Sequence, residues 1–155
     1  MKWNIPPRIK VFEAFGCIGD KRITLNDDGA EVLSSSRGKS YSVRYDPMKR
    51  AIMANDNGSY WSGYLGYPSI AFLMLKGVIK YDPACAEALK NIPWKDVNQK
   101  FKDDFEKTER YVNDIVKARG ISVEKVNKEI DGVYKQVKSM NMMQLGEKVK
   151  PPEGY

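Results

Sequence analysis

Four short segments between residues 22 and 54 alternate with clusters of turn-forming residues. We predict strands at residues 22–25, 30–34, 40–45 and 50–54. The strongest turn signal is Asn-Asp-Asp-Gly at residues 26–29, because glycine adopts positive φ without strain. In the third strand we expect Tyr41, Val43 and Tyr45 on one face and Ser40, Ser42 and Arg44 on the solvent face. This pattern predicts an antiparallel meander of three or four strands.

Helices are predicted before and after the meander. Residues 8–18 fit neither period cleanly, but Ile9, Phe12 and Phe15 are spaced by three, which favours a helix over a strand. Residues 68–76 form an apolar helix, and the longest apolar run is about half the roughly 20 residues that a membrane helix needs. A short helix follows at residues 82–89, with Asp82 as its N-cap.

The C-terminal third has the pattern of two long helices. Apolar residues recur every three or four positions from Trp94 to Ile115, which predicts one long helix that ends near Gly120. Ser122 is expected to cap a second helix. Its apolar stripe is formed by Val123, Val126, Ile130, Val133, Val137 and Met140. A short connection between two such helices predicts an antiparallel hairpin.

The expected fold class is α+β, with a small antiparallel β-meander packed on an apolar helix and followed by a long C-terminal antiparallel helical hairpin. Residues 1–93 are expected to form the α+β unit. Residues 94–145 form the hairpin within the same domain, and residues 146–155 form a flexible tail with Pro151 and Pro152. No linker or internal repeat divides the chain.

A tyrosine- and tryptophan-rich loop at residues 55–67 joins the meander to the apolar helix. Two interpretations of its aromatic residues stay open. They could form a binding surface for a base or a protein, or they could fill the space between sheet and helix while the glycines allow tight bends. Residues 55–75 contain no Lys or Arg, which counts against base stacking unless the strands supply positive charge.

Composition removes several kinds of chemistry. The chain has no histidine and two cysteines, Cys17 and Cys85, each among apolar residues. The absence of histidine excludes Cys–His and Ser–His catalysis. We expect both thiols to be buried and unreactive. The sequence also lacks a Gly-rich phosphate loop with its lysine. We therefore expect no cofactor and no metal, a chain without a membrane span, and a reducing, cytoplasmic location. The net charge is +6, and the lysine-rich composition with charges of both signs would suit a thermophile.

The order of elements resembles a SWIM-type zinc domain over residues 8–79. The resemblance rests on a Ser-rich strand (VLSSS), a Tyr-x-Val strand (SYSVRYD) and the motif GYPSIAFLML, which opens the apolar helix. In SWIM domains a Cys-x-Cys pair and a Cys-x-His pair bind zinc. Here the equivalent positions fall near Ile52 and Ala54 and at Gly66 and Pro68, so no zinc ligand is present. The resemblance implies a metal-free domain that binds DNA, RNA or protein.

The leading functional hypothesis is a non-enzymatic interaction module that binds protein or nucleic acid. Its candidate surface is Arg37, Lys39, Arg44, Tyr60, Trp61 and Tyr64. A second hypothesis is a homo-oligomer or scaffold assembled through the stripe from Val123 to Met140. A third is a small-molecule enzyme that uses a carboxylate or tyrosine in the aromatic loop region.

Overall fold

A computed structural model of the chain describes residues 1–153. Its helices are α1 (Ile9–Gly19), the π-helical turn η1 (Gly58–Ser62), α2 (Tyr67–Leu75), α3 (Ala84–Ala88), α4 (Trp94–Phe101), α5 (Phe105–Ala118) and α6 (Val123–Ser139). Its strands are β1 (Ile23–Leu25), β2 (Gly29–Leu33), β3 (Ser40–Asp46), β4 (Ala51–Ala54) and β5 (Met143–Gln144). The α+β fold and the C-terminal helical hairpin are confirmed.

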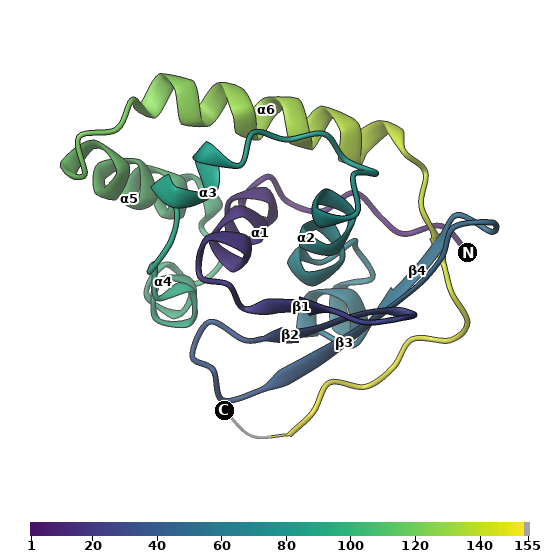
Figure 1. The fold of residues 1–155 in the computed structure, drawn as a ribbon. Helices are drawn as coiled ribbons and strands as arrows, with labels where there is room; N and C mark the ends of the chain where they lie inside the picture. Colours follow the sequence, from purple (N-terminus) through teal and green to yellow (C-terminus); the bar gives the residue numbers. More distant parts are fainter. Residues whose placement is uncertain (154–155) are drawn as a thin grey trace.

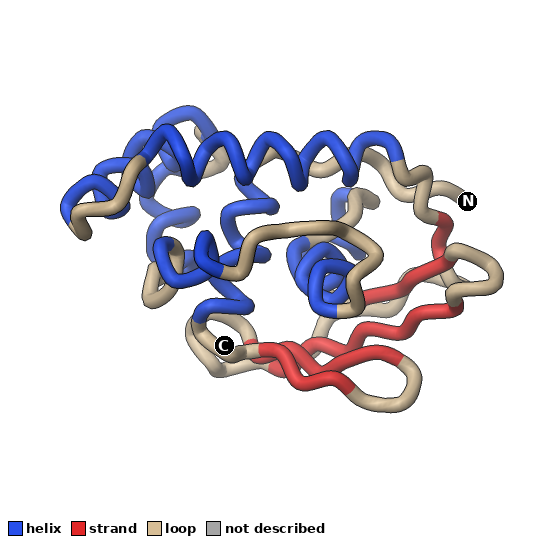
Figure 2. The backbone as a smooth tube through the Cα atoms, turned by 45° about the horizontal axis from the view of Figure 1, so that its top comes forward, coloured by secondary structure: helices blue, strands red, loops and turns tan. Residues whose placement is uncertain are grey.

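The five strands form one sheet in the order β1-β2-β3-β4-β5, antiparallel from β1 to β4 and parallel between β4 and β5. Figure 2 shows the strands gathered on one side of the molecule and the helices on the other. Helix α2 packs on the sheet, α1 packs on α2, and α5 and α6 cover α1 (Figure 1). The core is continuous through these layers.

In β3 one face is buried and the other exposed, whereas all four residues of β4 are buried. Tyr41 and Val43 point into the core, whereas Ser40, Ser42 and Arg44 are exposed. This alternation follows from the two-residue period of a strand and confirms the predicted faces. The serine hydroxyls of the exposed face are held by the carboxylate of Glu31 on β2.

The edge of β4 is covered by β5, which in turn pairs with the N-terminal segment, and the sequence pattern did not indicate this. Trp3 is buried, its backbone N–H donates to the carbonyl of Met142 at 3.0 Å, and its indole N–H donates to the carbonyl of Ile52 at 2.9 Å. Strand β5 pairs with β4 through Ala51 and Ile52. Pairing of this kind protects an edge from association with other chains.

The long helix predicted from Trp94 is interrupted. Helix α4 ends at Phe101, and Lys102 and Asp103 have positive φ values of 47° and 67°. Helix α5 then begins at Phe105, with the side chain of Asp104 accepting a hydrogen bond from the backbone N–H of Lys107. The prediction of one continuous helix was therefore wrong, and the break turns α4 toward the sheet side of the molecule (Figure 1).

The apolar stripe of α6 is used inside the chain. Val126, Ile130, Val133 and Val137 are buried, and α6 packs on α1, α3 and α5. Val123 and Met140, at the ends of the stripe, are partly buried against the same core. The stripe is therefore not the free surface on which the oligomer hypothesis was based, because the protein's own helices cover it.

Two further findings concern membrane-spanning helices and the C-terminal tail. Within residues 1–153 no helix is both long and apolar enough to cross a membrane. The expected tail has no regular structure over residues 146–153, but Lys148 donates to the carbonyl of Tyr60 on η1 at 3.1 Å. The last two residues of the predicted tail, 154–155, lie outside the described part of the chain.

Candidate ligand-binding cleft

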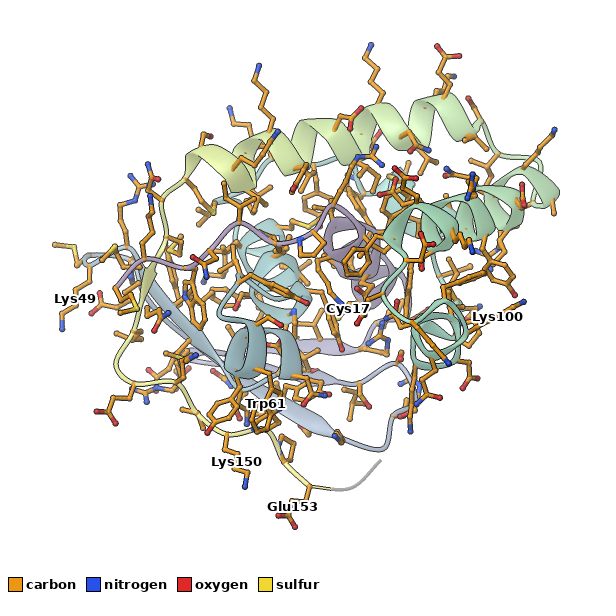
Figure 3. The ribbon with its side chains drawn as sticks, turned by 180° about the vertical axis from the view of Figure 1, so that it is seen from behind. Cys17, Lys49, Trp61, Lys100, Lys150 and Glu153 are labelled. Carbon is orange, nitrogen blue, oxygen red and sulfur yellow. The ribbon has the colours of Figure 1, made fainter. Side chains whose placement is uncertain are left out.

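A cleft of about 500 Å³ opens where α1, the β2–β3 turn, β3, η1 and α4 meet. Trp61 marks the η1 side of this region, and α4, which carries Lys100, lies on the other side in Figure 3. The lining side chains come from sequence segments as far apart as Lys10 and Asp103. Both polar and aromatic groups reach the cleft, which is typical of small-molecule sites.

Helix α1 contributes a buried ion pair to the cleft. Residues three apart lie side by side on a helix, and Lys10 Nζ lies 2.8 Å from Glu13 Oε2. The other oxygen, Oε1, accepts a hydrogen bond from Asn98 Nδ2 of α4 at 3.1 Å. Burial lowers the pKa of Lys10, but the Glu13 carboxylate, together with Tyr64 and Asp56, outweighs burial and raises that pKa above its ordinary value. Lys10 therefore remains an ammonium ion at neutral pH.

Asp56 is a second buried carboxylate, and its hydrogen bonds fix the loop that carries η1. Its oxygens accept from the hydroxyl of Ser59 at 2.6 Å and from the Ser59 backbone N–H at 3.2 Å. Burial raises the pKa of Asp56, and the two bonds from Ser59 oppose that rise. The carboxylate also fits closely against Gly66, where any Cβ would overlap it. Asp56 thus joins η1 to the start of α2.

Three tyrosines line the inner part of the cleft. Burial raises the pKa of Tyr41 on β3, and it also raises the pKa of Tyr64, where the Lys10 ammonium partly offsets it. Burial raises the pKa of Tyr67 well above its ordinary value, although the guanidinium of Arg22 lies near its ring. All three hydroxyls therefore keep their protons at neutral pH and can donate hydrogen bonds.

The β2–β3 turn supplies three serine hydroxyls and a lysine. Ser34 Oγ accepts from the backbone N–H of Lys39 at 3.1 Å and lies 3.3 Å from Ser36 Oγ. Ser35 Oγ accepts from the backbone N–H of Lys95 at 3.2 Å and so satisfies a donor in the first turn of α4. These bonds hold the turn against α4 at the side of the cleft.

An exposed indole stands beside the cleft. Trp61 is 68% exposed, an unusual position for so large an apolar ring. The ring of Tyr60 packs against it edge-on, with centroids 4.7 Å apart. Lys148 of the C-terminal segment approaches the Tyr60 ring in turn, 6.0 Å from its centroid. Neighbouring groups therefore hold the Trp61 ring in place while one side remains open.

Three of the six predicted binding residues, Lys39, Trp61 and Tyr64, line this cleft together. The other three do not reach it. Arg37 donates to the backbone carbonyl of Asp20 at 3.2 Å, and Arg44 lies on the exposed face of the sheet. Tyr60 supports Trp61 from outside the lining. The predicted surface is therefore divided rather than continuous.

Sequence reasoning missed Lys10, Glu13 and Tyr41. The signal for the first two was present, since a lysine and a glutamate three residues apart interrupt the otherwise apolar α1. Tyr41 was predicted to face the core, and the cleft opens on that same face.

The cysteines are confirmed as buried. Burial raises the pKa of Cys17 and of Cys85 to about 12, so both thiols are protonated and unreactive at neutral pH. In the described part of the chain, no three His, Cys, Asp or Glu side chains are grouped in a way that could hold a metal ion.

The fold and cleft define an α+β protein with a five-stranded sheet and a polar, aromatic cleft beside it. The chain belongs to the family described as uncharacterised conserved protein UCP014422, whose family model matches residues 3–143. The interpretation as a SWIM-type domain was therefore wrong. Of the four positions that would bind zinc, Ile52 and Ala54 are core residues of β4, and Gly66 and Pro68 form the start of α2. No curated protein and no solved structure matches the chain.

Proposed function

We propose that this protein binds a small polar molecule in the cleft. The observation that carries the proposal is the convergence of the Lys10–Glu13 pair with the hydroxyls of Tyr41 and Tyr64 in one cavity of about 500 Å³. A volume of this size suits a metabolite, and buried polar groups provide its orientation and specificity.

Recognition is favoured over nucleophilic catalysis by the protonation of the available groups. The Glu13 carboxylate raises the pKa of Lys10 despite burial, which leaves the amine without a free lone pair at neutral pH. Burial likewise raises the pKa of Cys17. A charged ammonium and a neutral thiol bind and pack, but they do not attack a substrate.

A broad nucleic-acid surface has less support than a small-molecule site. The basic residues expected to follow a phosphate backbone are separated, with Arg44 on the exposed sheet face and Lys39 in the cleft. Backbone recognition needs a continuous row of cations. The cleft can admit one flexible molecule of modest size without such a row.

The test is a thermal-shift screen with a library of neutral, cationic and anionic metabolites, run on three forms of the protein. Ser36→Trp places an indole at the exposed side of the cleft, whereas Lys49→Trp places one on the remote β3–β4 turn (Figure 3). We expect at least one compound to raise the Tm of the wild type and of Lys49→Trp but not that of Ser36→Trp. A library without a stabilising compound, or compounds that stabilise all three forms equally, would overturn the proposal.

A further inference from the structure

Building on the proposed function, we infer that the ligand is an anion that carries a flat ring. Its phosphate or carboxylate lies at the β2–β3 turn beside Lys39, and its ring lies against Trp61. The inference rests on three features of the lining: which hydrogen-bonding groups remain free, which charges remain uncompensated, and which aromatic ring is open.

At the β2–β3 turn, the hydrogen-bonding groups that remain free are donors. Each serine oxygen at the β2–β3 turn already accepts a backbone N–H: that of Lys39 for Ser34, of Lys95 for Ser35 and of Gly38 for Ser36. A hydroxyl that accepts one bond keeps its own proton to donate. Because Ser34 and Ser36 face each other, one of their two protons is shared between them. The remaining hydroxyl protons are available to a ligand.

The tyrosines add donors to the same cavity. Tyr41 and Tyr64 line it, and burial keeps both in the O–H form because it raises the pKa of each. A wall of O–H groups is complementary to a ligand rich in acceptors, and carboxylate and phosphate oxygens are the strongest acceptors in metabolites.

The lining holds three carboxylates, and protein groups occupy the two that lie on α1 and before η1, whereas Asp103 lies on the connection between α4 and α5, away from the β2–β3 turn in sequence. Asp56 accepts two bonds from Ser59, and Glu13 lies between Lys10 and Asn98. Among residues 1–153 Lys39 forms no ion pair, so its ammonium stands uncompensated beside the hydroxyls. A ligand anion would provide the missing charge partner.

The aromatic end of the site requires a flat group. Trp61 lines the cleft, is 68% exposed, and has Tyr60 packed edge-on against it, so one face of the indole is open to a ligand. Indole faces stack on planar rings and show little preference among them. The cavity of about 500 Å³ is large enough for a ring and an anionic group in one molecule.

The experiment is isothermal titration calorimetry with matched pairs of probes. Adenosine 5′-monophosphate and adenosine test a phosphate, and 1-naphthoate and 1-naphthamide test a carboxylate. Inorganic phosphate and acetate test the anion without a ring. We expect at least one ring-bearing anion to bind about tenfold or more tightly than its neutral partner and than the corresponding anion without a ring. A difference of about tenfold in affinity is what one charged hydrogen bond or one stacked ring contributes. The pair that shows this difference identifies the phosphate or carboxylate source.

Two variants assign the contacts. Lys39→Gln should weaken the anion about tenfold and leave the neutral partner unchanged, whereas Trp61→Ala should weaken both. Lys49→Gln, on the remote turn, serves as the matched charge control and should change neither. Equal affinity of the neutral and anionic partners would overturn the inference while leaving the proposed function intact. The absence of binding by every probe would also overturn the inference of an anionic, ring-bearing ligand. The proposed function would then be tested separately by the thermal-shift screen of metabolites.

Discussion

Lys10 and Glu13 form an ion pair 2.8 Å long on the inner face of α1, with only 16% and 5% of their side chains exposed. The pair links three elements, because Glu13 also accepts from Asn98 of α4 and the Lys10 ammonium interacts with the hydroxyl of Tyr64 before α2. Charges removed from water in this way are stable only while both partners are present. The pair therefore supports the fold and shapes the floor of the cleft.

Replacement of Glu13 by Gln should destabilise the protein by about 3 kcal/mol, because Lys10 would remain buried without its counter-charge. The free energy of unfolding, measured by urea denaturation, checks this. Glu87→Gln is the matched control, since Glu87 pairs with Lys90 at the same i,i+3 spacing but on the surface, and it should remain close to wild type. Equal stability of Glu13→Gln and wild type would mean that the pair is not buried.

Cys17 should make the protein less stable in alkali. Burial raises the pKa of its thiol from 9.0 to about 12. Below pH 9 the thiol is protonated in both states and contributes no pH dependence. Above it the unfolded chain releases the proton that the native state retains, so stability falls as pH rises, by up to about 1.4 kcal/mol per pH unit.

Urea denaturation of wild type and Cys17→Ala between about pH 9.5 and pH 11 measures this contribution. The variant loses some packing at every pH, but its stability should fall less steeply than that of wild type. Alkylation provides an independent check. At about pH 8.5 iodoacetamide should label the urea-unfolded chain and leave native Cys17 unmodified. Stability curves of wild type and Cys17→Ala that run parallel with pH, together with rapid labelling of Cys17 in the native protein, would show that Cys17 is solvent-accessible.

The sequence predicted those parts of the fold that depend on local patterns. Alternation in residues 40–45 and the turn at residues 26–29 determine the meander, and the Ser122 cap determines the start of α6. The break between α4 and α5 had no such signal, because Lys102 and Asp103 adopt positive φ without a glycine. Tertiary packing of α4 against the β2–β3 turn compensates for that strain.

The candidate site could be predicted only in part, because it depends on contacts between distant segments. Trp61 and Tyr64 were noticeable as an aromatic cluster, and Lys39 as a cation near serines. Their meeting with Lys10 and Asn98 requires α4 to reach α1, where Asn98 donates to Glu13, and no local period encodes that arrangement. The closure of the β4 edge by Trp3 and β5 is non-local for the same reason.

Gly66 should be intolerant of any side chain. A Cβ at this position would overlap the buried carboxylate of Asp56, whose bonds to Ser59 hold η1 in place. Gly66→Ala should therefore cost about 2 kcal/mol or more, which is typical of overpacking beside a buried polar group. The midpoint of chemical denaturation gives the change.

Gly132 provides the opposite case, because it lies within α6 and a Cβ there would meet no atom within 4 Å. Gly132→Ala should stabilise the protein by about 0.5–1 kcal/mol through helix propensity alone. If both alanines have the same effect, the close fit between Gly66 and Asp56 is not present.

Trp61 should account for nearly all tryptophan fluorescence that acrylamide can quench in the native protein. Trp3 and Trp94 are buried, with the Trp3 indole bonded to Ile52 and the Trp94 indole packed against Gly16, whereas Trp61 is exposed. Quenching requires contact between acrylamide and the ring, so Trp61→Phe should remove the steep component of the Stern–Volmer plot while unfolding in urea restores it. Lys49→Gln should leave the native plot unchanged. Strong quenching in folded Trp61→Phe would mean that Trp3 or Trp94 is exposed to solvent. That result would contradict the covered edge of β4 or the buried position of Trp94 in the cleft wall.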